Sequence, residues 1–133
     1  MRIAFDVDGV LVSFTSAYQR LVVSCANGVD LFKGGDLEDP PCWNGPEYRG
    51  YAVEVVRAAW ETIKHDPAFW LNLEPLPDVK TLALLIHHLE RHHDIYYVTN
   101  RVGDRAKRQT EIWLFEHLCY HVNIAKVWPT VLI

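Results

Sequence analysis

The sequence has few of the features that would tie a chain to an oxidising compartment, a membrane or a nucleic-acid polymer. Its three cysteines, Cys25, Cys42 and Cys119, are an odd number without a CxxC pair, which favours a reduced, cytoplasmic setting. No apolar run approaches the roughly 18 to 20 residues of a membrane span, and the N-terminus lacks the regions of a signal peptide. We therefore expect no membrane partner.

Basic residues are also scarce relative to acidic ones. Thirteen Lys and Arg against 17 Asp and Glu give a formal net charge of −4, which argues against a broad basic face for nucleic-acid polymers. A small phosphorylated ligand is not excluded, because it needs only a local group of donors. The sequence is also compatible with a homodimer.

What is present indicates a single α/β domain. Half of the 133 residues are apolar and 12% are aromatic, enough to bury a core. Apolar spacing predicts strands at 2–8, 94–99 and 127–133, and helices at 13–27, 47–64, 78–91 and 103–117. We expect Asp104 to be the N-cap of the last of these helices.

The order of these elements predicts a Rossmann-like parallel sheet with helices on both faces. Residues 13–75 are too long for a simple crossover, so we expect a helical cap inserted after the first strand, with residues 1–12 and 76–133 forming the core. A three-stranded parallel sheet is hard to cover on both faces, and the chain ends in an apolar segment. We therefore expect the C-terminal part of the core to be missing from these 133 residues.

The first chemical motif is Asp6-Val7-Asp8-Gly9-Val10, at the end of the first strand. Residues two apart in a strand project to the same side, so Asp6 and Asp8 are predicted to lie side by side where open α/β sheets bind ligands. Two charges about 4 Å apart repel by roughly 4 kcal/mol at an effective dielectric near 20, so we expect a cation there. Oxygen ligands and a phosphorylated substrate favour Mg²⁺. The alternative is a pair of solvated aspartates at a turn.

The second motif is Thr99-Asn100-Arg101, directly after the second strand. If the strands are parallel neighbours, the hydroxyl of Thr99 and the amide of Asn100 can donate to phosphate oxygens at the same edge. An ordinary Thr-Asn turn is the alternative. Arg101 begins a local basic patch that either attracts an anionic substrate or is a solvated helix face; its other members are Arg105, Lys107 and Arg108.

Together these segments resemble the haloacid dehalogenase-like superfamily of phosphatases. DVDGV matches the first motif of that superfamily, and YYVTN matches the second, a hydrophobic strand that ends in Thr or Ser. Phe14, the inserted cap, and Phe69-Trp70 followed by LEPLP are similar to the 5′(3′)-deoxyribonucleotidase branch. The resemblance implies a Mg²⁺-dependent phosphomonoesterase that acts on nucleoside monophosphates.

The resemblance also implies a role for each motif residue. Asp6 would attack phosphorus and form an aspartyl-phosphate. Asp8 would protonate the leaving oxygen and later activate water, and Asp6 with the backbone carbonyl of Asp8 would bind Mg²⁺. Thr99 and Asn100 would hold the phosphoryl group.

Three aromatic residues would form the floor and wall of a nucleobase site, namely Phe14, Phe69 and Trp70. Stacking of a base on an aromatic ring is worth about 1–3 kcal/mol. The alternative for each ring is ordinary packing in the cap or core.

The sequence departs from the superfamily pattern downstream. A third-motif Lys or Arg and a fourth-motif acidic pair are expected after a third strand, and neither Lys107 nor Lys126 matches by position. Two rival functions therefore remain. One is a polynucleotide-end phosphatase of the same superfamily, which VTNRVGDR and TEIWL also resemble. The other is a catalytically silent domain that binds a nucleotide or a partner chain.

Overall fold

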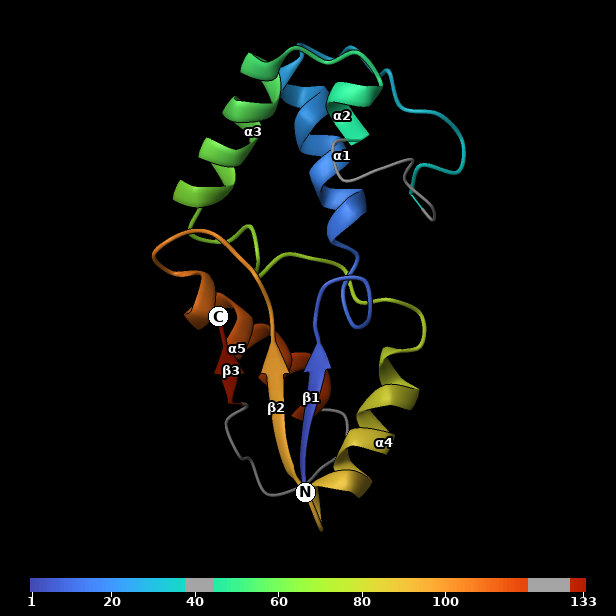
Figure 1. Cartoon of the computed structure of the whole chain (residues 1–133), viewed down its shortest axis with the longest axis vertical. Coiled ribbons are helices and arrows are strands. Elements are labelled where there is room, and N and C mark those ends of the chain that lie inside the picture. Colours follow the sequence, from blue (N-terminus) through green and yellow to red (C-terminus); the bar gives the residue numbers. More distant parts are fainter. Residues whose placement is uncertain (38–44, 120–129) are drawn as a thin grey trace. The chain divides into compact units, whose positions relative to one another are not determined.

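The computed structural model describes residues 1–37, 45–119 and 130–133, which form a mixed α/β structure (Figure 1). The chain divides into two compact units, one of residues 1–13 with 67–133 and one of residues 14–66. The elements in chain order are β1 (Arg2–Asp6), α1 (Phe14–Cys25), α2 (Gly45–Tyr48), α3 (Val53–His65), α4 (Val79–Glu90), β2 (Asp94–Val98), α5 (Ala106–Leu114), the π-helical turn η1 (Phe115–Cys119) and β3 (Val131–Leu132).

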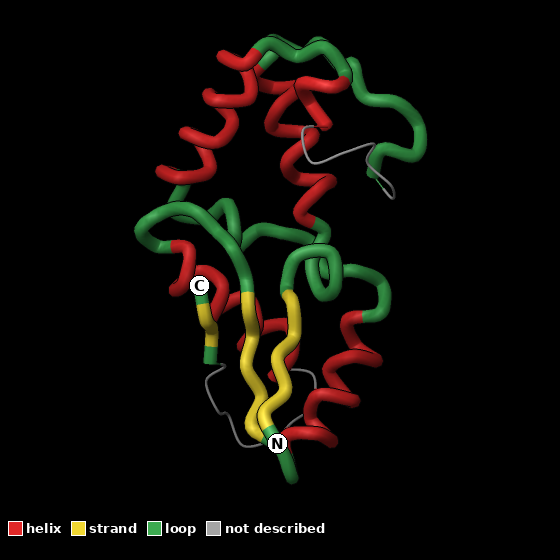
Figure 2. The backbone as a smooth tube through the Cα atoms, viewed as in Figure 1, coloured by secondary structure: helices red, strands yellow, loops and turns green. Residues whose placement is uncertain are grey.

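The first unit contains a three-stranded parallel sheet in the order β1-β2-β3 (Figure 2). Phe5 pairs with Tyr97, and Tyr97 pairs with Val131. This arrangement confirms the parallel sheet and the predicted strands that lead into the two motifs. Strands β1 and β2 are each shorter than predicted. Most of the last predicted strand, 127–133, lies outside the described residues, which include only 130–133 of it.

Burial alternates along the strands and distinguishes the two faces of the sheet. Tyr97 and Val131 are buried on one face, whereas Ala4 and the paired Val98 and Leu132 are exposed on the other. Helix α4 contacts β2 and η1, and α5 contacts β3, so the described helices of this unit form one connected layer. The prediction of helices on both faces is therefore not met in the described part of this unit.

Helix α5 begins later in the chain than the sequence predicts. The prediction that Asp104 caps this helix is wrong, because the helix starts at Ala106 and Arg105 occupies the N-cap position without a side-chain cap hydrogen bond. Gly103 has φ of 111°, and the N–H of Ala106 donates to its carbonyl at 3.2 Å. Asp104 consequently lies in a turn that precedes the helix.

The second unit contains helices α1, α2 and α3, and they differ from the predicted ones. One helix over 47–64 was expected, and α2 and α3 are found instead. Gly50 has φ of 100°, a conformation that glycine adopts at little cost, and it separates the two. The unit ends at Asp66, whereas the predicted insertion continued to 75.

Helices α1 and α3 pack around a small core in this unit. Its buried members are Val22, Tyr51, Val56 and Ala59. The hydroxyl of Tyr51 donates to the carbonyl of Val29 and accepts the N–H of Leu31, both at 2.8 Å. These bonds attach the loop after α1 to the core.

Candidate functional site

Asp6 is the last residue of β1, and it is exposed. It pairs in register with Val98, the residue directly before Thr99, so both motifs follow neighbouring strands at the same edge. The Oδ1 atom of Asp6 accepts the N–H of Val7 at 2.8 Å. That bond fixes the carboxylate beside its own backbone, and the exposure of Asp6 makes it accessible to a ligand.

A tight loop follows Asp6 and carries Asp8. The N–H groups of Leu11 and Val12 both donate to the carbonyl of Val7, at 2.9 and 3.2 Å. Gly9 has φ of 78°, which an L side chain rarely adopts, and its N–H donates to the carbonyl of Val12 at 3.0 Å. The glycine of the first motif therefore serves the turn that places Asp8.

Asp8 of the first motif accepts hydrogen bonds from two residues of the second motif, Thr99 and Arg101. Thr99 Oγ1 donates to Asp8 Oδ2 at 2.9 Å. Arg101 donates from Nε to Asp8 Oδ2 at 3.2 Å and from Nη2 to Asp8 Oδ1 at 2.7 Å. The sequence predicted that Thr99 and Asp8 would share one edge, and these contacts bring them together.

The role of Arg101 differs from the predicted basic patch. Its side chain is 0% exposed, so it does not belong to a solvated helix face. Its Nη1 donates to Thr110 Oγ1 at 2.8 Å, and its guanidinium lies 4.7 Å from the ring centroid of Trp70. The positive charge beside Asp8 is thus a guanidinium.

Sequence reasoning did not find this partnership, although one signal was available. Residues two apart in an extended segment project to the same side, so Thr99 and Arg101 were placed to reach a common partner. Both contact Asp8.

Two of the three aromatic residues predicted beside the base, Phe69 and Trp70, differ in their surroundings. Trp70 is only 2% exposed, and its indole Nε1 donates to the carbonyl of Val102 at 3.0 Å. With Arg101 over its ring, Trp70 is part of the protein interior. Phe69 is half-buried and meets Trp70 edge-on at 5.1 Å.

Phe14, the third predicted base-binding residue, belongs to the other unit. There it stacks on Tyr18 at 5.3 Å and lies 6.0 Å from Trp60. All three rings are half-buried. Burial raises the pKa of Tyr18, partly opposed by a hydrogen bond with Trp60. Phe14 is therefore packed in an aromatic cluster of its own unit.

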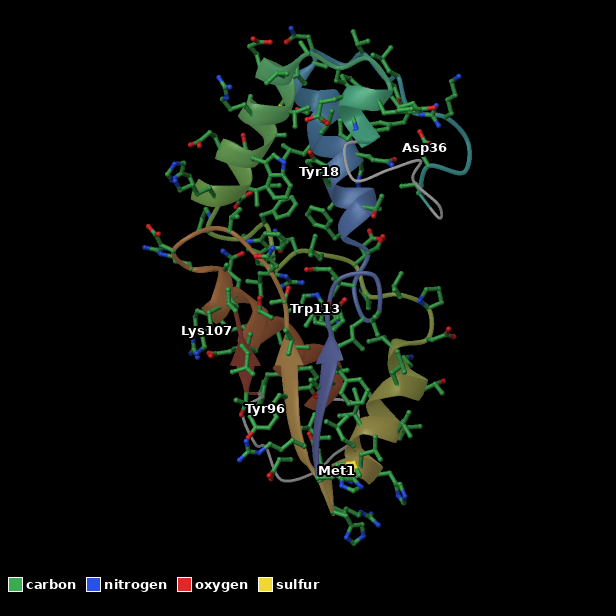
Figure 3. The ribbon with its side chains drawn as sticks, in the orientation of Figure 1. Met1, Tyr18, Asp36, Tyr96, Lys107 and Trp113 are labelled. Atoms are coloured by element: carbon green, nitrogen blue, oxygen red, sulfur yellow. The ribbon has the colours of Figure 1, made fainter. Side chains whose placement is uncertain are left out.

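The segment around Trp70 is fixed by two polar side chains of α5 that the sequence did not single out. Gln109 Oε1 accepts the N–H groups of Trp70 and Leu71, at 2.9 and 3.3 Å. Trp113, fully buried on the same helix (Figure 3), donates from Nε1 to the carbonyl of Leu73 at 2.7 Å. These bonds hold the segment beneath Arg101.

Of the remaining predicted site residues, Asn100 is exposed directly after Thr99. Lys107 lies exposed on α5 (Figure 3), and Lys126 lies outside the described residues. In the described ranges, no group of three or more His, Cys, Asp or Glu side chains is arranged to hold a metal ion.

The acidic side chains at the site fit one mode of magnesium binding. Mg²⁺ usually keeps several waters and binds through one or two carboxylates together with substrate phosphate. Among the described residues, Asp6 engages only its Oδ1 in a hydrogen bond, whereas both oxygens of Asp8 are engaged. The carboxylate that fits is therefore that of Asp6, with the backbone carbonyl of Asp8 as the expected second ligand.

Comparison with known proteins adds no family assignment. No protein-family model matches the chain, and no curated protein matches it. No described helix has both the length and the apolar character needed to cross a membrane.

Proposed function

We propose that the protein is a Mg²⁺-dependent phosphomonoesterase that acts through an aspartyl-phosphate on Asp6. The observation that carries the proposal is the meeting of the two motifs at one edge of the sheet. Asp6 ends β1 opposite Val98, and Thr99 reaches back to Asp8 at 2.9 Å. This arrangement supports a single site for a phosphate ester at the carboxyl ends of parallel strands.

In this proposal each residue acts on a stated atom. An oxygen of Asp6 attacks phosphorus in line with the ester oxygen, which takes a proton from Asp8 as the P–O ester bond breaks. Asp8 then accepts a proton from the water that attacks the phosphoenzyme and releases Asp6. Asn100, which is exposed directly after Thr99, holds a phosphoryl oxygen, while the hydroxyl of Thr99 donates to Asp8 Oδ2. A magnesium ion bound at Asp6 would neutralise charge on the phosphoryl oxygens.

We propose nucleoside monophosphates as the substrate class. One feature of the first unit supports a base-binding role for an aromatic residue, namely that Phe69 is half-buried beside Trp70. Because Trp70 is buried, it does not contribute to the predicted base site. The net charge of −4 favours mononucleotides over polymer ends.

Hydrolysis of dUMP, with and without Mg²⁺, tests the proposal. We expect phosphate release that requires Mg²⁺, is abolished by a chelator and falls more than about 1,000-fold in Asp6→Asn. Asp94→Asn is the matched control, because Asp94 is an exposed aspartate at the opposite end of the neighbouring strand. Equal activity of Asp6→Asn and the wild-type protein would contradict the proposal.

One observation favours the silent binding domain as a second candidate. The Asp8 carboxylate is already paired with Arg101, as it would be in a purely structural ion pair. That candidate predicts binding of a nucleotide, measured by calorimetry, without any release of phosphate. A 3′-phosphorylated oligonucleotide hydrolysed faster than dUMP would instead favour a polynucleotide-end phosphatase.

A further inference from the structure

Arg101 is a buried charge whose position is determined from several sides. Its side chain has no exposed surface, and a buried charge is costly unless it is paired and hydrogen-bonded. Asp8 takes two of its N–H groups, Thr110 takes a third, and Trp70 lies against the guanidinium. Such constraint leaves the guanidinium one orientation relative to Asp8.

The two oxygens of Asp8 are consequently not equivalent. Oδ2 accepts from both Thr99 and Arg101, whereas Oδ1 accepts only from Arg101 within the described part of the chain. A carboxylate oxygen offers about two acceptor positions, so Oδ2 is saturated and Oδ1 retains one. The Asp8 side chain is still 26% exposed, which leaves it accessible from the outside.

We propose that Arg101 is a positioning residue that makes Oδ1 of Asp8 the atom that gives and takes the proton. This inference rests on the proposed phosphatase function. Thr99 and Arg101 occupy both acceptor positions of Oδ2, and Arg101 occupies one of the two on Oδ1. The remaining position on Oδ1 is therefore where Asp8 can hold the proton for the ester oxygen.

The test uses two esters that differ in their need for a proton. The p-nitrophenolate group leaves without protonation, whereas the alkoxide of benzyl phosphate requires a proton from Asp8. The kcat/KM value reports formation of the phosphoenzyme. We expect Arg101→Lys, which keeps the charge but not the two-point contact, to lose about 100-fold on benzyl phosphate and less than about 5-fold on p-nitrophenyl phosphate.

Comparison variants separate positioning from folding. Asp8→Asn should show the same selective loss, and Arg91→Lys, an exposed arginine beyond α4, should lose nothing on either ester. Thr110→Val removes only the hydroxyl that accepts Nη1 of Arg101, and it should show a weaker form of the same selectivity. If Arg101→Lys does not fold, the selectivity of Thr110→Val between the two esters tests the positioning role.

Equal losses on both esters, or no loss on either, would overturn the positioning role while the phosphatase function stands. A wild-type protein that hydrolyses neither these esters nor dUMP with Mg²⁺ present would contradict the proposed function and this inference with it.

Discussion

Arg101 binds both carboxylate oxygens of Asp8 although the two side chains differ sharply in exposure. The side chain of Arg101 is 0% exposed and that of Asp8 is 26% exposed. Loss of either partner therefore leaves a different charge behind. Without Asp8, a buried guanidinium has lost its counter-ion, whereas without Arg101 the remaining carboxylate still reaches water.

This difference predicts unequal effects on stability. Asp8→Ala should lower the free energy of unfolding by about 3 kcal/mol or more, since removal of one partner leaves an uncompensated buried charge. Arg101→Met, which keeps the apolar contact with Trp70, should cost less. Denaturant unfolding of both variants measures the difference. A smaller loss for Asp8→Ala than for Arg101→Met would contradict the burial assigned to this pair.

Gln109 should stabilise the first unit through its acceptor oxygen. Gln109→Leu leaves the N–H groups of Trp70 and Leu71 without that partner, and unsatisfied buried donors cost about 1–3 kcal/mol each. We expect a loss of about 2 kcal/mol in chemical denaturation. Lys107→Gln, an exposed change on the same helix, should change stability by less than about 0.5 kcal/mol. Similar effects of the two substitutions would argue against this role of Gln109.

Phe69 and Trp70 should behave differently when mutated. Phe69 is half-buried, so Phe69→Leu is expected to raise KM for a nucleoside monophosphate about 10-fold, the lower part of the stacking range. KM for a small sugar phosphate, which has no base to stack, should stay within about 2-fold. Trp70→Phe should instead reduce thermal stability, because it removes the bond to Val102. Equal effects of Phe69→Leu on both substrates would exclude base stacking there.

The second unit should lose stability in acid through Asp36. Hydrogen bonds from Arg49, and then from the backbone of Lys33, lower the pKa of Asp36 from 3.8 to about 2. Because the folded-state pKa is the lower one, this stabilisation is present above 3.8 and disappears as the pH falls toward 2. Thermal unfolding of wild type and Asp36→Asn across that window should converge at the acid end. A difference that does not change with pH would contradict the ion pair.

The apolar residues of the sequence were sufficient to predict β1 and β2, and the order of strands and helices predicted their parallel pairing. A half-buried strand must place every second side chain in the core, and Tyr97 and Val98 follow that rule. The helix expected over 47–64 failed because its apolar spacing continues across Gly50, whose positive φ interrupts the helix. The spacing of apolar residues does not predict a local change in backbone conformation such as the one at Gly50.

The site was predicted in part for a similar reason. Motif spacing could place Asp6, Asp8 and Thr99 at one edge of the sheet. It could not reveal that Arg101 would be buried against Asp8, or that Trp70 would be covered, because both depend on contacts with α5 and the preceding loop. Charged and aromatic residues have surface and interior uses that sequence alone does not distinguish.

Trapping of the phosphoenzyme tests the central claim most directly. The protein is mixed with Mg²⁺ and a nucleoside monophosphate carrying radiolabelled phosphate, quenched in acid within one turnover, and digested for peptide mapping. We predict label on Asp6, labile to hydroxylamine, that is absent in Asp6→Asn and present in Asp94→Asn. Label on a different residue, or wild-type phosphate release by Asp6→Asn, would contradict the assignment of Asp6 as the nucleophile.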